Sequence, residues 1–126
     1  MKVEVNLFKT NMALIHQQLA KSLTYLRQEL KTNKLWQLQS PSAEALASTA
    51  PFCYDTLSFA QWLQFIFIER MQAMIANEMP LPNAISLCPM AEEAFKQHDA
   101  SIVKLINTLG DIDELLSGKR EQTRYE

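Results

Sequence analysis

Apolar residues near the start of the chain recur with the period of an α-helix. They step by three or four residues, which places them along one side of a helix, whereas a half-buried strand would alternate apolar and polar residues. The pattern therefore predicts a first helix from about residue 4 to about residue 32. Its apolar stripe consists of Val5, Phe8, Met12, Ile15, Leu19, Leu23, Leu26 and Leu30.

The densest apolar block, residues 51–71, predicts a second helix that is central to the core. Ser58 followed by Gln61 is a capping-box pattern, in which the two side chains satisfy free amides at a helix start. Thr56 or Asp55 is the alternative cap. Apolar side chains then follow a broad face if each residue turns the chain by about 100°. Because Pro80 cannot continue a helix, we expect the second helix to end near Glu78.

Two further helices are predicted in the last third of the chain. Pro89 opens a short third helix that reaches about residue 97, since proline is favoured in the first helical turn. A fourth helix follows, capped by Asp99 or Ser101. It ends at Gly118, because glycine readily adopts the left-handed conformation of a helix stop.

These patterns predict an all-α fold, a compact antiparallel four-helix bundle with a short third helix. Two glycines in 126 residues argue against hairpin-rich β architecture. Residues 1–118 are expected to form a single domain, followed by a frayed C-terminal tail of residues 119–126. Between residues 33 and 54 the periodicity fails, and Leu35, Trp36 and Leu38 are expected to plug one end of the bundle.

Charge is unevenly distributed along the chain, although the net charge is only −2. Residues 1–40 hold six Lys or Arg against two acids, a balance of +4, and residues 41–117 hold three against ten, a balance of −7. The first helix is therefore expected to attract the later helices, and the surface to be dipolar. Along the first helix the cations and a histidine form a basic arc of Lys9, His16, Arg27, Lys31 and Lys34.

Arg70 is the charge that regular helical periodicity places on the apolar face of the second helix. A buried guanidinium without a partner is costly, so we expect a carboxylate to reach it. Asp55 and Glu93 are the preferred partners, and Glu92 and Asp99 are the other candidates. The structural interpretations are an ion pair or a side chain that extends to water. The functional alternative is an anion receptor in a small ligand-binding bundle.

Motifs that specify chemistry are absent from the sequence. There is no HExxH, no pair of ExxH motifs, no P-loop and no dinucleotide-binding glycine pattern. Cys53 and Cys88 lack the spacing of a zinc site, and we expect both as reduced thiols in a cytoplasmic protein. We predict no catalytic residues, no metal and no cofactor, and therefore a binding protein rather than an enzyme.

Several short motifs resemble the YqcC-like family of small uncharacterised bacterial proteins. They are LW (35–36), PF (51–52), DT (55–56), WLQ (62–64), RM (70–71), LP (81–82) and PMAEEA (89–94). The resemblance implies a compact all-α bundle without established catalytic or cofactor-binding residues. Genes of this family often stand beside a gene for a tRNA pseudouridine synthase, which suggests that enzyme as a partner.

The preferred functional hypothesis is a cytoplasmic accessory protein that binds a tRNA pseudouridine synthase. Acidic residues of the later helices would dock on the basic enzyme, namely Glu92, Glu93, Asp111, Asp113 and Glu114. The basic arc would remain free for tRNA, with weak and salt-sensitive binding on its own. The alternatives are a direct RNA-binding module that uses Arg27, Lys31 and Lys34, and a ligand-binding bundle centred on Arg70.

Overall fold

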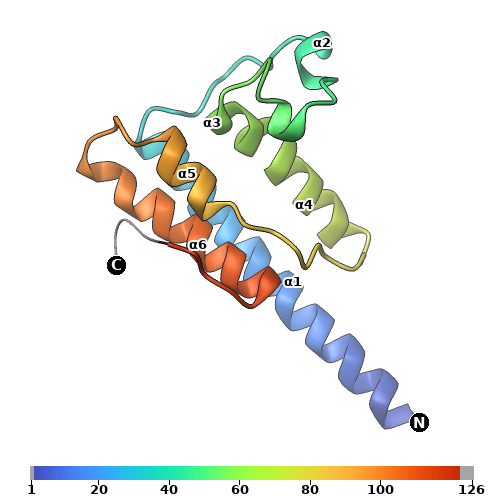
Figure 1. The fold of residues 1–126 in the computed structure, drawn as a ribbon. Helices are drawn as coiled ribbons and strands as arrows, with labels where there is room; N and C mark the ends of the chain where they lie inside the picture. Colours follow the sequence, from blue (N-terminus) through green and yellow to red (C-terminus); the bar gives the residue numbers. More distant parts are fainter. Residues whose placement is uncertain (1, 123–126) are drawn as a thin grey trace.

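The computed structural model is built from helices, with no strand in the part of the chain that it describes (Figure 1). It describes the backbone of residues 2–122 and the side chains of residues 11–122. The elements in chain order are α1 (Lys2–Thr32), α2 (Ala43–Leu46), η1 (Pro51–Cys53), α3 (Phe59–Trp62), η2 (Leu63–Phe67), α4 (Ile68–Ala76), α5 (Cys88–Ala94), η3 (Ala100–Ile102) and α6 (Val103–Ser117). The predicted all-α class is confirmed.

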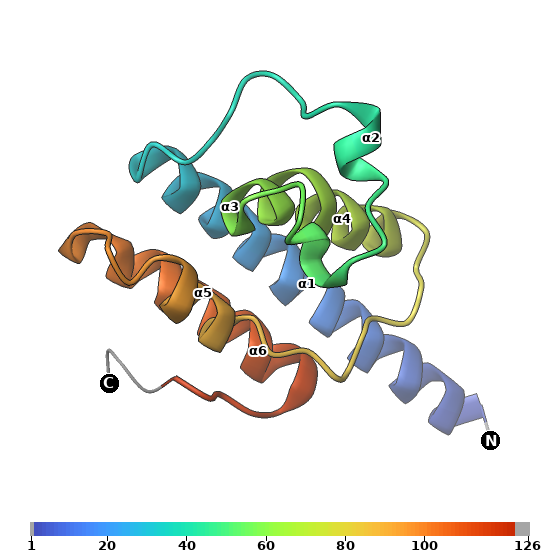
Figure 2. The ribbon, with the colours of Figure 1, turned by 45° about the horizontal axis from the view of Figure 1, so that its top comes forward.

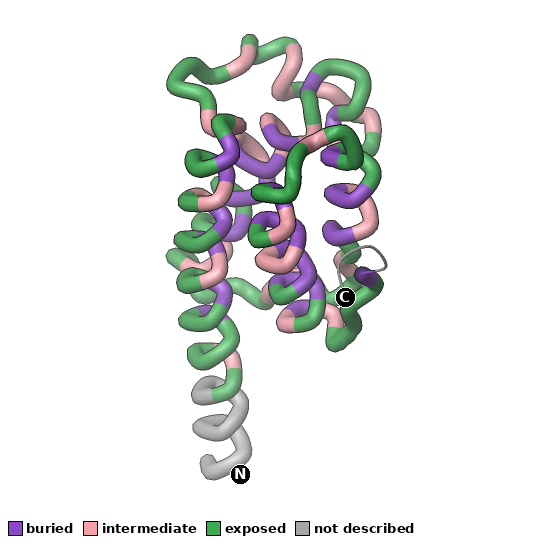
Figure 3. Tube along the Cα trace, turned by 90° about the vertical axis from the view of Figure 1, so that its left-hand side faces the viewer, coloured by how far each residue is buried: buried purple, intermediate pink, exposed green. Residues whose placement is uncertain are grey.

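The helices surround one core (Figure 2). α1 contacts α4 and α6, and α5 contacts both α6 and α3, so that these segments enclose the core between them. Buried positions follow the inner side of these helices (Figure 3). Largest among the fully buried side chains are Leu19, Leu23, Leu26, Leu30, Leu63, Ile68, Leu87, Ile102, Leu105, Ile106, Leu109 and Ile112. The predicted stripe of the first helix is therefore buried from Leu19 onward, whereas Ile15 is 37% exposed and Val5 and Phe8 lie outside the described side chains.

The start of the second helix is formed as the sequence predicts. The Ser58 hydroxyl accepts the backbone N–H of Gln61 at 3.1 Å, and the Gln61 side-chain oxygen accepts the backbone N–H of Ser58 at 2.8 Å. Both bonds satisfy amides that have no partner inside the helix. α3, η2 and α4 then continue as one helical segment to Ala76.

The middle of this segment is a π-helical turn rather than an α-helical one. Over Leu63–Phe67 the hydrogen bonds widen, so that the backbone N–H of Ile68 bonds to the carbonyl of Leu63, five residues earlier. The turn holds one additional residue. Since a residue of α-helix turns the chain by about 100°, side chains after the insertion are rotated by about that angle from a regular extrapolation.

Two helices end in a left-handed residue that is not glycine. At the end of α1, Lys34 has φ 60°, its N–H bonds to the carbonyl of Lys31, and the N–H of Leu35 bonds to the carbonyl of Leu30. This is the Schellman motif. α4 ends in the same way with Glu78 at φ 52°. The predicted helix stop at Gly118 is confirmed, with φ 78° and an N–H bond to the carbonyl of Glu114.

The connection from α1 to α3 is fixed by one side chain. Gln64 is buried, and its amide donates to the carbonyl of Gln37 at 2.7 Å while its oxygen accepts the N–H of Gln37 at 2.9 Å. Leu35 and Trp36 pack against the core, but Leu38 is 97% exposed. The prediction that Leu38 helps to plug the bundle is therefore wrong, because Gln37, the residue before it, is held at the surface of the fold by these two bonds.

Candidate binding surfaces

Arg70 does not occupy the buried position that regular periodicity predicts. It lies exposed on α4, and the ion pairs among the described residues do not include it. The π-helical turn is the reason, because the inserted residue rotates Arg70 away from the side that buries Leu63 and Met71. An exposed guanidinium needs no carboxylate partner, so the predicted pairing is wrong.

The carboxylates predicted to meet Arg70 have other surroundings. Asp55 is exposed and accepts the hydroxyl of Ser48 at 2.6 Å. Glu93 is exposed and accepts the ammonium of Lys96 at 2.7 Å. Glu92 is only 6% exposed and lies on the inner side of α5. The structure therefore does not bring these residues together into one site.

Arg27, Lys31 and Lys34 follow one another along the end of α1, and we call them the basic line. Arg27 is half-buried, and Lys31 and Lys34 are exposed. The ammonium of Lys31 lies 5.0 Å from the centroid of the Trp36 ring, a cation–π contact. His16 of the predicted basic arc does not join this surface, because it is 9% exposed and its Nε2 contacts the carbonyl of Met79 at 2.9 Å. The side chain of Lys9, also in that arc, lies outside the described residues.

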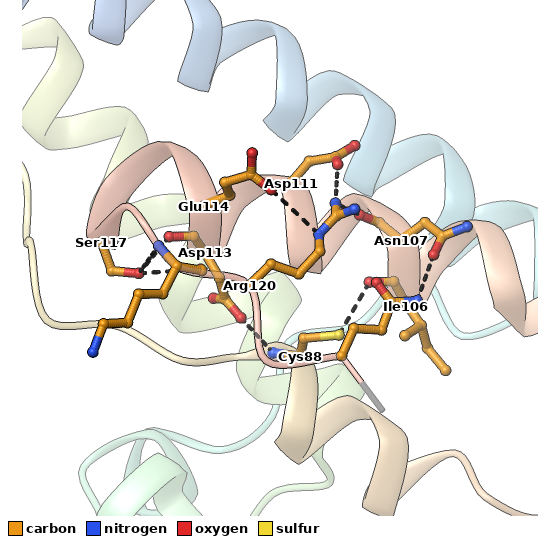
Figure 4. Close-up of polar contacts among 10 residues, drawn as sticks. Cys88, Ile106, Asn107, Asp111, Asp113, Glu114, Ser117 and Arg120 are labelled. Atoms are coloured by element: carbon orange, nitrogen blue, oxygen red, sulfur yellow. Dashed lines mark hydrogen bonds and ion pairs between the residues drawn. The ribbon is translucent and has the colours of Figure 1, made fainter. Parts of the chain in front are cut away.

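Asp113 is a buried carboxylate that joins α6 to α5 (Figure 4). It is 1% exposed and accepts the backbone N–H of Leu87 at 2.7 Å and that of Cys88 at 2.7 Å. These amides start α5 and have no partner within that helix. Burial raises the pKa of Asp113 above its usual range, against the opposing effect of the two amide bonds. The prediction that Asp113 and Glu92 belong to an exposed acidic docking face is wrong, because both side chains are buried.

Cys88 lies beside this carboxylate and is completely buried. Burial, together with the negative charges of Glu92 and Asp113, raises the pKa of its thiol to about 12. Its sulfur contacts the carbonyl of Ile106 at 3.6 Å. Since the thiolate is the nucleophilic form, a buried thiol with a raised pKa is typical of a structural cysteine. Cys53 is likewise a free, buried cysteine.

Residues 119–122 form a C-terminal strap that lies along α6 (Figure 4). The guanidinium of Arg120 pairs with Asp111 and Glu114 and donates to the carbonyl of Asn107 at 3.1 Å. Gln122 is 8% exposed and donates to the side chain of Asn107 at 2.6 Å. The predicted fraying of the tail is therefore wrong for residues 119–122, and residues 123–126 lie outside the described residues.

Gly110 explains how the strap approaches the helix. A Cβ at this position would lie 2.8 Å from Nε of Arg120 and 3.0 Å from Oε1 of Gln122. An alanine would favour the helix by about 1 kcal/mol in the absence of the strap. The glycine therefore provides space for the strap rather than flexibility within α6.

An apolar groove of about 200 Å³ opens between α1, α6 and the segment after α4. Ile15 and Met79 are 37% and 46% exposed beside it. The residues that line the groove are Met12, Ile15, His16, Pro80, Leu81, Pro82, Asn83, Leu115 and Leu116. Apolar surface of this kind is suited to contact with another protein.

Comparison with protein families shows to which family the chain belongs. The model of a family described as tRNA pseudouridine synthase C matches residues 18–115, most of the chain. The chain belongs to this family, DUF446. The matched range includes the basic line, the π-helical turn and the Asp113–Cys88 contact. None of the helices in the described region is both long and apolar enough to cross a membrane.

The relatives are of two kinds, uncharacterized proteins of similar length and a longer protein named as a synthase. An uncharacterized protein of Haemophilus influenzae is 40% identical over 93 residues, which cover 74% of this chain and 87% of the relative. Uncharacterized protein YqcC of Escherichia coli is 28% identical over 102 residues, 81% of this chain and 94% of the relative. tRNA pseudouridine synthase C of Pectobacterium carotovorum is 34% identical over 79 residues, which cover 63% of this chain but only 21% of that protein.

The fold also matches a solved structure. The solution NMR structure of YqcC from Escherichia coli superimposes with a TM-score of 0.73 at 26% sequence identity, covering 89% of this chain and 96% of that chain. The two chains therefore share one helical fold, as the resemblance to the YqcC-like family implies.

Proposed function

We propose that this chain is an accessory protein that binds a tRNA pseudouridine synthase. One observation carries the proposal: in Pectobacterium carotovorum a segment similar to this chain makes up 21% of a protein named tRNA pseudouridine synthase C. A covalent link keeps two modules together at a high effective concentration. Where the module is a separate chain, it needs an interface of its own to reach the enzyme.

The apolar groove and the exposed acids are the surfaces that suit such an interface. Ile15 and Met79 supply apolar contact. Asp111 and Glu114 share the single cation Arg120, so they leave net negative charge toward an enzyme that must be basic where it holds tRNA, whereas the charge of Glu93 is offset by Lys96. Glu92 and Asp113, being buried, take no part. Arg70 does not line the apolar groove, so an anion receptor at this residue has less support.

The proposal includes the arrangement and the location of the module. We infer an antiparallel four-helix bundle of α1, the α3–α4 segment, α5 and α6, since successive long helices reverse direction (Figure 2). The short third helix of this bundle is α5. A cytoplasmic location follows from the proposed partner, whose substrate is tRNA.

Titration calorimetry with purified tRNA pseudouridine synthase C from the same organism tests the proposal. We expect heat of binding at tens of micromolar protein in low salt. Ile15→Ser should weaken the complex, whereas Leu38→Ser is a matched control, because Leu38 is an exposed leucine outside the groove. If no heat is detected and a deletion strain modifies its tRNA normally, the proposal is wrong.

A further inference from the structure

A second groove, of about 440 Å³, lies between α1 and α4. Its sides are formed by Ala20 and Thr24 from α1 and by Gln72 and Ala76 from α4. The buried Leu23 lies at its base. Two of the side chains that face each other across this groove are alanines, and small side chains leave space between packed helices.

The polar groups of this α1–α4 groove are a guanidinium, an amide and a hydroxyl. Arg27 brings a guanidinium, whose planar donors suit phosphate oxygens. Gln72 brings an exposed amide, and the hydroxyl of Thr24, which donates to the carbonyl of Ala20 at 3.2 Å, retains its capacity to accept. This set of guanidinium, amide and hydroxyl is the one that proteins use on the phosphates and sugars of nucleic acids.

The basic line continues from this groove toward the end of α1. Arg27 and Lys31 are four residues apart and therefore project from the same side of α1, and Lys34 follows two residues after the end of the helix. Lys31 is held over Trp36. The ion pairs among the described residues occupy Lys96, His98 and Arg120, and none of them involves the basic line. Its positive charges are therefore available to a ligand.

We propose that the α1–α4 groove and the basic line bind the sugar-phosphate backbone of RNA. If the proposed function holds, the RNA is the tRNA that the partner enzyme binds. The groove and the basic line then extend the tRNA-binding surface of that enzyme. Three cations that follow one another beside a polar groove fit a polymer of phosphates better than a single small anion.

The charges also set the strength of binding. With three cations, the logarithm of the association constant should fall by about two for each tenfold rise in salt, which is about a 15-fold loss between about 50 and about 200 mM. Glu69 opposes the ligand, because it lies three residues before Gln72 on the same side of α4. Binding of tRNA by the isolated chain is therefore weak. These residues contribute more to tRNA affinity in the complex with the synthase.

Fluorescence anisotropy with bulk bacterial tRNA tests the inference, first with the full chain alone and then with its complex with the synthase. The triple variant Arg27→Gln, Lys31→Gln, Lys34→Gln should bind tRNA at least about tenfold more weakly and lose most of the salt dependence. Glu69→Gln should bind more tightly. Arg70→Gln is the matched control, an exposed arginine of α4 that does not line the groove, and should leave the affinity unchanged.

Three outcomes would overturn the inference. One is that Arg70→Gln weakens tRNA binding as much as the triple variant does, and another is that the triple variant keeps full tRNA affinity. The third is that poly-glutamate binds as tightly as tRNA, which would indicate an acidic protein segment as the ligand. Calorimetry of the triple variant with the synthase separates the two proposals. If the triple variant still binds the synthase and its tRNA affinity is unchanged, only this inference is wrong. If the unmodified chain binds tRNA through these residues but does not bind the synthase, only the proposed function is wrong.

Discussion

Asp113 on α6 holds the start of α5 through Cys88, whose backbone N–H it contacts at 2.7 Å. The same carboxylate accepts the N–H of Leu87 at 2.7 Å, so one side chain satisfies two amides of a neighbouring helix. A helix start is usually capped by a residue next to it in sequence. Here the cap comes from 25 residues away, and it therefore fixes the position of α5 on α6 as well as its beginning.

Removal of this cap should be among the more destabilising single changes in the chain. Asp113→Ala leaves two buried amides without an acceptor, and we expect a loss of about 2–4 kcal/mol in the free energy of unfolding. Denaturant unfolding followed by circular dichroism measures it. Asp111→Ala, which removes an exposed carboxylate of the same helix, should change stability by about 1 kcal/mol or less. Equal effects of the two variants would contradict the capping role.

Cys88 should be unreactive in the folded protein. With a pKa of about 12, only about one thiol in 10,000 is ionised at pH 8, and the side chain is buried as well. In a Cys53→Ser background, a thiol reagent should label no cysteine at pH 8 until denaturant is added. Rapid labelling under native conditions would show that α5 opens locally.

The same thiol predicts a loss of stability in alkali. Its pKa is raised from 9.0 to about 12 in the folded protein, so the folded state holds a proton that the unfolded state releases between these values. The free energy of unfolding should therefore fall as the pH rises above about 9. A Cys88→Ala variant is less stable throughout but should lack this part of the pH dependence. If the free energy of unfolding falls with pH equally in both proteins, the loss of stability does not come from Cys88.

Lys34→Gly should stabilise the protein. The left-handed conformation is strained by about 1 kcal/mol for a residue with a Cβ, and glycine adopts it freely. We expect a gain of about 0.5–1 kcal/mol in a thermal or denaturant melt. Lys31→Gly, three residues earlier and inside α1, should instead destabilise by about 1 kcal/mol. A loss of stability in Lys34→Gly would rule out this helix end.

Gly110 and Arg120 should be energetically coupled. Alanine at position 110 favours the helix but displaces the guanidinium of Arg120 from its contacts, so Gly110→Ala alone should be close to neutral. In an Arg120→Ala background the same change should stabilise by about 1 kcal/mol. A double-mutant cycle measures the difference. Additive effects would show that the strap does not rest on Gly110 in solution.

Local patterns in the sequence predict much of the fold. The capping box at Ser58, the glycine stop at Gly118 and the α1 stripe from Leu19 onward each depend on the spacing of nearby residues, and these parts of the prediction are confirmed. The widened turn after Leu63 could not be predicted in this way, because it depends on how the whole segment packs. The error at Arg70 follows directly from that turn.

The site was less predictable than the fold. Asp113 has a recognisable signal, since it lies four residues after Leu109 and three before Leu116, among the buried positions of α6. A lone acid at such a position indicates a buried hydrogen-bonding role. The strap has a weaker signal, the glycine inside α6, which only the approach of Arg120 explains.

The π-helical turn at Leu63–Phe67 has a consequence for comparing relatives. A homologue with a regular α-helix here would bury an equivalent core with one residue fewer. A correct alignment then needs a one-residue gap inside an unbroken helix, where alignment methods penalise gaps most strongly. If the gap is omitted, every position on one side of the turn is paired with a neighbour of its true counterpart, and an exposed residue such as Arg70 is matched to a buried one.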